Sequence, residues 1–123
     1  MIIIFLSILA GIFKSAADVL DTKFCESWFR RFKGNWFIDP VLSWENKHKF
    51  DHMFGLSFIV TPFSDLWHLL YTFMIICLIS IGPFYTSLTS FDVSIIWNNI
   101  FTCILCAGSY CIGFEITYFF LLT

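Results

Sequence analysis

KSAADVLDTKFCESWFRRFKGNWFIDPVLSWENKHK, residues 14–49, contains all seven basic residues of this 123-residue chain. The apolar stretches on either side contain none. Lys and Arg close to membrane spans are retained on the cytoplasmic side, so this asymmetry predicts a multi-pass membrane protein with a cytoplasmic basic loop. The composition agrees, because 59% of the residues are apolar and 13% are charged, about half the charged share of a soluble domain.

Three helices with apolar runs fit around this loop, and each helix reaches the length of about 20 residues that a membrane span needs. We expect a single all-α membrane domain, 1–123, with transmembrane helices at about residues 2–24, 62–82 and 91–122. The intervening loop, 25–60, is expected to hold one or two interfacial helices, because aromatic and basic residues alternate in it. The basic loop then assigns the N-terminus to the outside and the C-terminus to the cytoplasm.

The first of these helices is expected to have a polar face. Six residues recur at helical spacing along one side of it: Ser7, Gly11, Lys14, Asp18, Asp21 and Cys25. The small residues on this face would let a neighbouring helix approach closely. Further along, Lys14 and Asp18 form an i,i+4 pair where the helix leaves the bilayer. The apolar run 1–13 has the length of a signal-peptide core, but no basic residue precedes it and no clean small-residue cleavage site follows it.

Titratable residues from all three spans are expected at the cytoplasmic side of the bundle. Asp65 and His68 share a face where the second span begins, and Glu115 lies about two turns before the end of the third. Asp18 and Asp21 lie where the first span ends. Carboxylates and imidazoles bind metals such as Zn²⁺ or Mn²⁺ and also relay protons. The pattern predicts His68 and Glu115 as catalytic groups and a divalent-metal site formed by Asp65, His68, Glu115 and Asp18.

Each of these residues also has a purely structural interpretation. Asp65 occupies an N-cap position, and Asp18 can be neutralised by Lys14. Glu115 can accept a hydrogen bond from a neighbouring Tyr or Trp. The chain has no Ser/His/Asp order, no glycine-rich phosphate loop and no HExxH motif, so no specific catalytic signature decides between these interpretations.

Two short segments resemble a pattern in small uncharacterised multi-spanning bacterial membrane proteins. The first is Ser43-Trp44-Glu45-Asn46-Lys47, and the second is Asp65-Leu66-Trp67-His68, which opens an apolar helix. The similarity extends over about a third of the chain, from Asp39 to Leu70. The resemblance implies a bacterial inner-membrane setting and brings no activity with it.

Two classes of function fit these observations. The first is a non-catalytic subunit or oligomeric component of a membrane assembly, which is channel-like in one version. The Ser109-xxx-Gly113 spacing supports this class, because such spacing suggests helix contacts beyond the monomer. The second is a membrane-embedded metal- or proton-dependent enzyme acting on a lipid-type substrate through Asp65, His68 and Glu115. Anionic lipid headgroups are the expected partners of the basic loop 14–49. Nucleic acid is not expected as a partner, because carboxylates dilute the basic residues.

Overall fold

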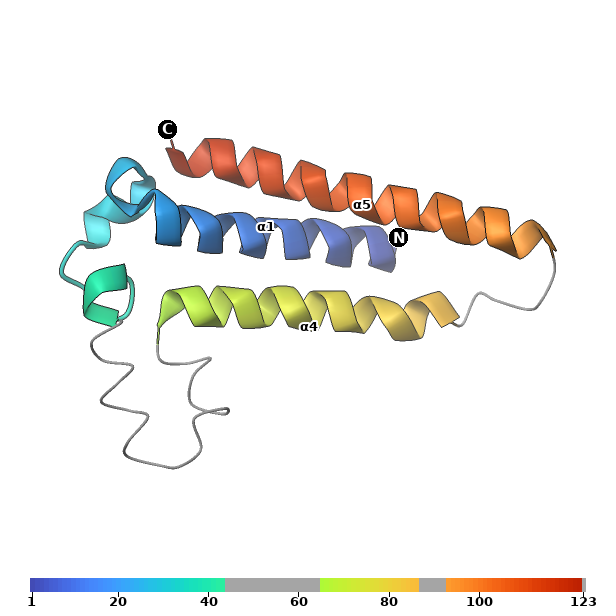
Figure 1. The fold of residues 1–123 in the computed structure, drawn as a ribbon, viewed down its shortest axis with the longest axis horizontal. Helices are drawn as coiled ribbons and strands as arrows, with labels where there is room; N and C mark the ends of the chain where they lie inside the picture. The colour runs from blue at the N-terminus through green and yellow to red at the C-terminus, as the bar shows by residue number, and fades with distance from the viewer. Residues whose placement is uncertain (44–64, 87–92, 123) are drawn as a thin grey trace, which may run out of the picture.

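The computed structural model describes residues 1–43, 65–86 and 93–122, whose regular elements are all helices (Figure 1). The long helices are α1 (Ile2–Thr22), α4 (Leu66–Thr86) and α5 (Val93–Leu122). Two short 3₁₀ helices, η1 (Phe24–Glu26) and η2 (Trp28–Phe32), follow α1. No strand occurs in the described ranges, so the predicted all-α class is confirmed there.

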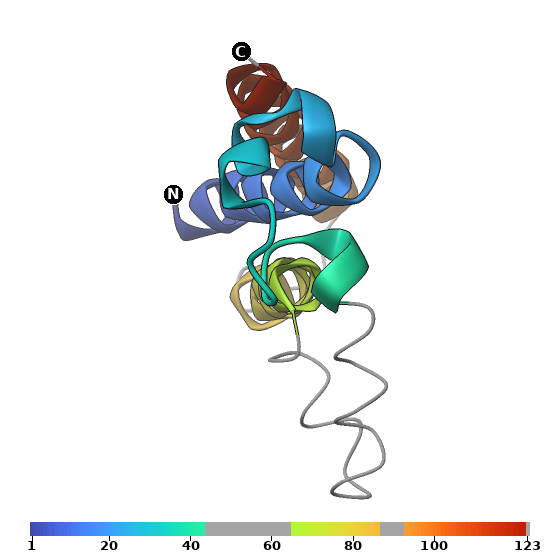
Figure 2. The same ribbon diagram turned by 90° about the vertical axis from the view of Figure 1, so that its left-hand side faces the viewer.

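The three long helices pack side by side with α1 in the middle (Figures 1 and 2). Helix α4 runs antiparallel to α1, whereas α5 runs parallel to it on the opposite side (Figure 1). The 3₁₀ helices, the start of α4 and the end of α5 therefore share one end of the bundle (Figure 1). We name it the loop end.

Helices α1 and α5 approach closely through two glycines. A Cβ added at Gly11 would overlap the backbone oxygen of Tyr110, and one added at Gly113 would overlap the backbone oxygen of Ile8. Each glycine has a buried serine one turn before it, at Ser7 in α1 and Ser109 in α5. These pairs form a small-xxx-small contact. The prediction that small residues of the first helix admit a close neighbour is confirmed. The Ser109-xxx-Gly113 spacing, expected to serve contacts beyond the monomer, is used inside the chain.

The limits of the second long helix differ from those predicted. Helix α4 begins at Leu66 and continues through Gly82 and Pro83 to Thr86, whereas the sequence predicted a stop at 82. A proline removes one backbone N–H and kinks a helix, but a helix packed along a neighbour can continue past it. The expected start at 62 lies outside the described residues, as does the remainder of the loop from 44 to 60.

Within the described ranges, two helices are long and apolar enough to cross a membrane. They are Ile2–Thr22, with a mean hydropathy of 2.0, and Trp97–Leu122 within α5, with 1.6. The apolar part of α4, Leu66–Gly82, is shorter. Only 11% of the most apolar stretch of α5 is buried in the chain, against 39% for α1. An apolar helix so little covered is unlike the core helix of a soluble protein, so it indicates membrane association.

The described part of the loop where interfacial helices are expected contains the short 3₁₀ helix η2, which follows η1. Phe29 is buried against the bundle, whereas Arg30, Arg31 and Lys33 are exposed. The guanidinium of Arg31 lies 5.9 Å from the centre of the Trp28 ring. This segment therefore turns Phe29 toward the bundle and its three cations outward.

Candidate functional site

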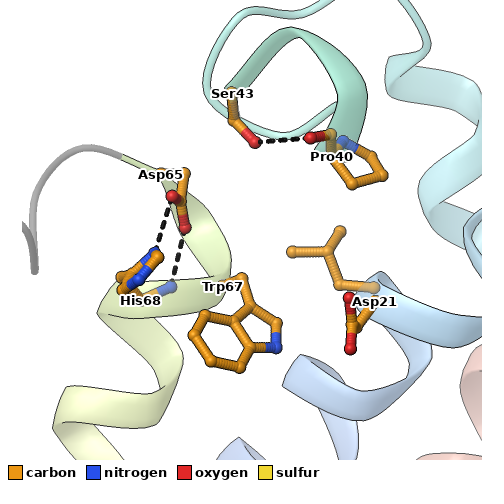
Figure 3. A pocket seen from close by; sticks show the side chains of 7 residues that line it. Asp21, Pro40, Ser43, Asp65, Trp67 and His68 are labelled. Atoms are coloured by element: carbon orange, nitrogen blue, oxygen red, sulfur yellow. Dashed lines mark hydrogen bonds and ion pairs between the residues drawn. The ribbon is translucent and has the colours of Figure 1, made fainter. Parts of the chain in front are cut away.

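A pocket of about 400 Å³ lies at the loop end, between α1 and α4 (Figure 3). Its walls come from three segments: Leu20 and Asp21 of α1, Pro40 and Ser43 of the loop, and Asp65, Trp67 and His68 at the start of α4. Three residues singled out by the sequence, Asp21, Asp65 and His68, are thus brought to one place.

Asp65 and His68 form a tightly connected pair. One carboxylate oxygen of Asp65 accepts the backbone N–H of His68 at 2.8 Å, and the other lies 2.7 Å from the imidazole Nδ1 (Figure 3). The first bond is the N-cap predicted as the structural interpretation of Asp65. The second fixes the ring orientation, as a carboxylate does for histidines that bind metals or transfer protons. A single carboxylate, 4% exposed, performs both tasks.

A second aspartate shapes the loop wall of the pocket. The buried carboxylate of Asp39 accepts the backbone N–H groups of Gly34, at 2.9 Å, and Val41, at 3.1 Å. Gly34 has a φ of +90°, which a residue with a side chain rarely adopts. The backbone N–H of Leu66 donates to Phe37 at 2.9 Å and joins this turn to α4.

Ser43 and Trp67 are pocket residues that the site prediction did not include. The Ser43 hydroxyl donates to the backbone oxygen of Pro40 at 3.3 Å (Figure 3). The Trp67 ring stacks on Tyr71 with centroids 5.2 Å apart and meets the His68 ring edge-on at 4.7 Å. Its Nε1 is buried and has no hydrogen-bond acceptor in the part of the chain that the structure describes. A buried N–H of this kind normally finds a partner.

Asp18, one of the predicted metal ligands, lies outside this pocket. Its carboxylate forms an ion pair with Lys14, one turn earlier in α1. The Lys14 ammonium also lies 5.9 Å from the centre of the Tyr71 ring. The structural interpretation of Asp18 as the partner of Lys14 is therefore confirmed.

Glu115, the other predicted ligand and catalytic group, is exposed on α5. Because α1 lies between α4 and α5, Glu115 is separated from the pocket that holds Asp65 and His68 (Figures 1 and 2). Among the described residues, no three His, Cys, Asp or Glu side chains are grouped as a metal ion requires. The structure thus joins Asp65 to His68 but does not add Asp18 or Glu115 to them.

The pocket brings together the two segments that carried the sequence resemblance. Ser43, the described member of the first segment, faces Asp65, Trp67 and His68 of the second across it (Figure 3). Residues 44–47 lie outside the described ranges. A comparison of this chain with protein-family models, with curated proteins and with solved structures finds no match. The functional interpretation accordingly rests on this geometry.

Proposed function

We propose that this chain is a small three-span protein of a bacterial inner membrane that acts as a non-catalytic subunit of a membrane assembly. The spans are α1, α4 and α5, with the loop end in the cytoplasm and the start of α1 outside. This topology is supported by the up-down-up course of the helices and by the exposed Arg30, Arg31 and Lys33 at the loop end (Figure 1).

The observation that carries the assembly proposal is the position of Glu115. It is exposed in α5 beside the exposed apolar side chains of Ile112, Ile116 and Phe119. At 1.5 Å per residue it lies about 10 Å before the end of the helix at Leu122. A carboxyl group facing hydrocarbon at this depth costs several kcal/mol unless a partner satisfies it.

Room for such a partner exists on the same side of α5. Gly108 and Cys111 are exposed at i−7 and i−4 from Glu115, and no atom lies within 4 Å of a Cβ built at Gly108. We call the stripe Gly108, Cys111 and Glu115 the outer face of α5. Small residues beside a polar one are the usual features of helix contacts in membranes. The expected occupant is the outer face of a second copy, where two carboxyl groups share a proton.

The test is the mass of the purified protein in mild detergent, measured by native mass spectrometry. The wild-type chain is expected as a multiple of 14.4 kDa. Glu115→Leu should shift it to the monomer, because the polar contact is lost. Ile79→Ala, a truncation at an exposed position of α4, is the matched control and should keep the wild-type mass. A monomeric wild-type protein, or equal effects of both variants, would contradict the proposal.

Membrane lipids are the second class of partner that we propose. The basic side chains of η2 and Lys33 point outward at the loop end, beside the exposed ring of Trp28. Each Lys or Arg near an anionic membrane surface contributes about 1 kcal/mol of attraction. Binding is tested by native mass spectrometry with added phosphatidylglycerol. Arg30→Gln/Arg31→Gln should retain less of that lipid.

A second candidate function is a proton-dependent enzyme acting on a lipid-type substrate. The Asp65–His68 pair in a pocket favours it, since a carboxylate bound to Nδ1 prepares an imidazole to act as a general base. Glu115 is not a catalytic group of this proposed enzyme, because it lies outside the pocket. Incubation of the protein with membrane lipids, followed by lipid mass spectrometry, is expected to give a product that His68→Ala does not form.

A further inference from the structure

We propose that the pocket between α1 and α4 binds the primary ammonium group of a phosphatidylethanolamine headgroup. The inference rests on the proposed topology, in which the loop end of the bundle lies at the level of the cytoplasmic headgroups. It does not depend on the oligomer formed through α5.

The charge of the pocket favours a cation. Its described lining includes two carboxyl groups, Asp21 and Asp65, and one imidazole, but no Lys or Arg. Lys23, which directly follows α1, pairs with Glu26 at 3.1 Å instead of entering the pocket lining. A concave site lined by carboxylates concentrates positive ligands.

Asp21 is the group we assign to the ammonium. It is exposed at the end of α1, and it makes no hydrogen bond or ion pair within the described ranges, unlike the three other aspartates there. Asp65 already uses both oxygens on His68, so it contributes mainly its charge. An ammonium has three N–H donors and needs few acceptors, whereas a divalent metal needs several converging oxygen ligands. The pocket therefore fits an ammonium better than a metal ion.

Trp67 provides a second and independent indication. Its ring lies in the pocket wall, where the face of an indole attracts an ammonium. The ring stacks on Tyr71 with centroids 5.2 Å apart, and this contact holds it in the wall.

The experiment is native mass spectrometry of the full chain in detergent with an equimolar mixture of three lipids of identical acyl chains. These are phosphatidylethanolamine, phosphatidylcholine and phosphatidylglycerol. Wild-type protein should retain phosphatidylethanolamine roughly tenfold more than either of the others, as a charge-assisted hydrogen bond implies. Asp21→Asn should abolish the preference, and Trp67→Phe should weaken it while keeping the ring.

Lys23→Gln/Glu26→Gln is the matched control, because it removes an exposed carboxylate at the same end but outside this pocket, together with the lysine with which this carboxylate pairs. It should leave the preference unchanged. Soluble phosphoethanolamine in excess should displace the lipid if the headgroup alone is recognised; failure to displace it assigns recognition to the anchored lipid. Equal retention of the three lipids, or equal loss in Lys23→Gln/Glu26→Gln, overturns the inference. The same spectra report the oligomer mass, so this failure is distinguishable from failure of the assembly proposal.

Discussion

The carboxylate of Asp65 holds His68 twice, by its backbone N–H at 2.8 Å and by its Nδ1 at 2.7 Å. The start of α4 and the orientation of the pocket imidazole therefore depend on the same side chain. Asp65 and His68 can be substituted independently, so the structural role of the Asp65 cap can be measured apart from any functional role of the imidazole.

Asp65→Ala should destabilise the protein by about 1–2 kcal/mol, since it removes an N-cap and leaves His68 without its carboxylate. His68→Ala keeps the cap and should cost less than about 1 kcal/mol. Thermal unfolding in detergent, followed by circular dichroism, measures both. If His68→Ala were as costly as Asp65→Ala, the cap would not be the main structural contribution of this pair.

Gly113→Ala should loosen the contact between α1 and α5. Its Cβ would overlap the backbone oxygen of Ile8, and rigid backbone must shift to accommodate it, at a cost of about 1–3 kcal/mol. Gly82→Ala in α4 is the control, because its Cβ meets no atom within 4 Å. That substitution should be neutral or stabilising by up to about 1 kcal/mol, since alanine favours helix. Equal unfolding midpoints for both variants would refute the close approach.

Asp18→Asn should leave the Lys14 ammonium without its anion inside the bundle. We expect a loss of about 1–2 kcal/mol, below the cost for a fully buried pair because both side chains are about one-third exposed. The double variant Lys14→Met/Asp18→Leu should recover most of this loss, because it removes both charges. Unfolding curves of the two variants and the wild type measure the loss and its recovery. A double variant as unstable as Asp18→Asn would argue against the ion pair as the cause.

Chemical labelling of Cys25 tests the proposed membrane topology. It is exposed in η1 at the loop end, so a membrane-impermeant maleimide should label it in inverted membrane vesicles but not in intact cells. The measurement uses a variant in which the four other cysteines are replaced by serine or alanine. Labelling in intact cells would reverse the proposed orientation of all three spans.

Several features of this protein were predictable from the sequence because they are local. Apolar length and helical periodicity specify three long helices, and i,i+4 spacing specifies the pair of Lys14 and Asp18. The N-cap role of Asp65 is likewise a matter of neighbouring residues.

Only the tertiary structure decided which of the polar residues meet. The sequence placed Glu115 and His68 at a common depth, but α1 lies between their helices and keeps them apart. Asp39 folds its turn back on α4, and this brings Ser43 to Asp65. Spacing along a helix defines the face on which a residue lies, whereas the neighbour of that face depends on how whole helices pack. In this chain two glycines, Gly11 and Gly113, let α5 pack closely against α1, and the pocket forms on the opposite side, between α1 and α4.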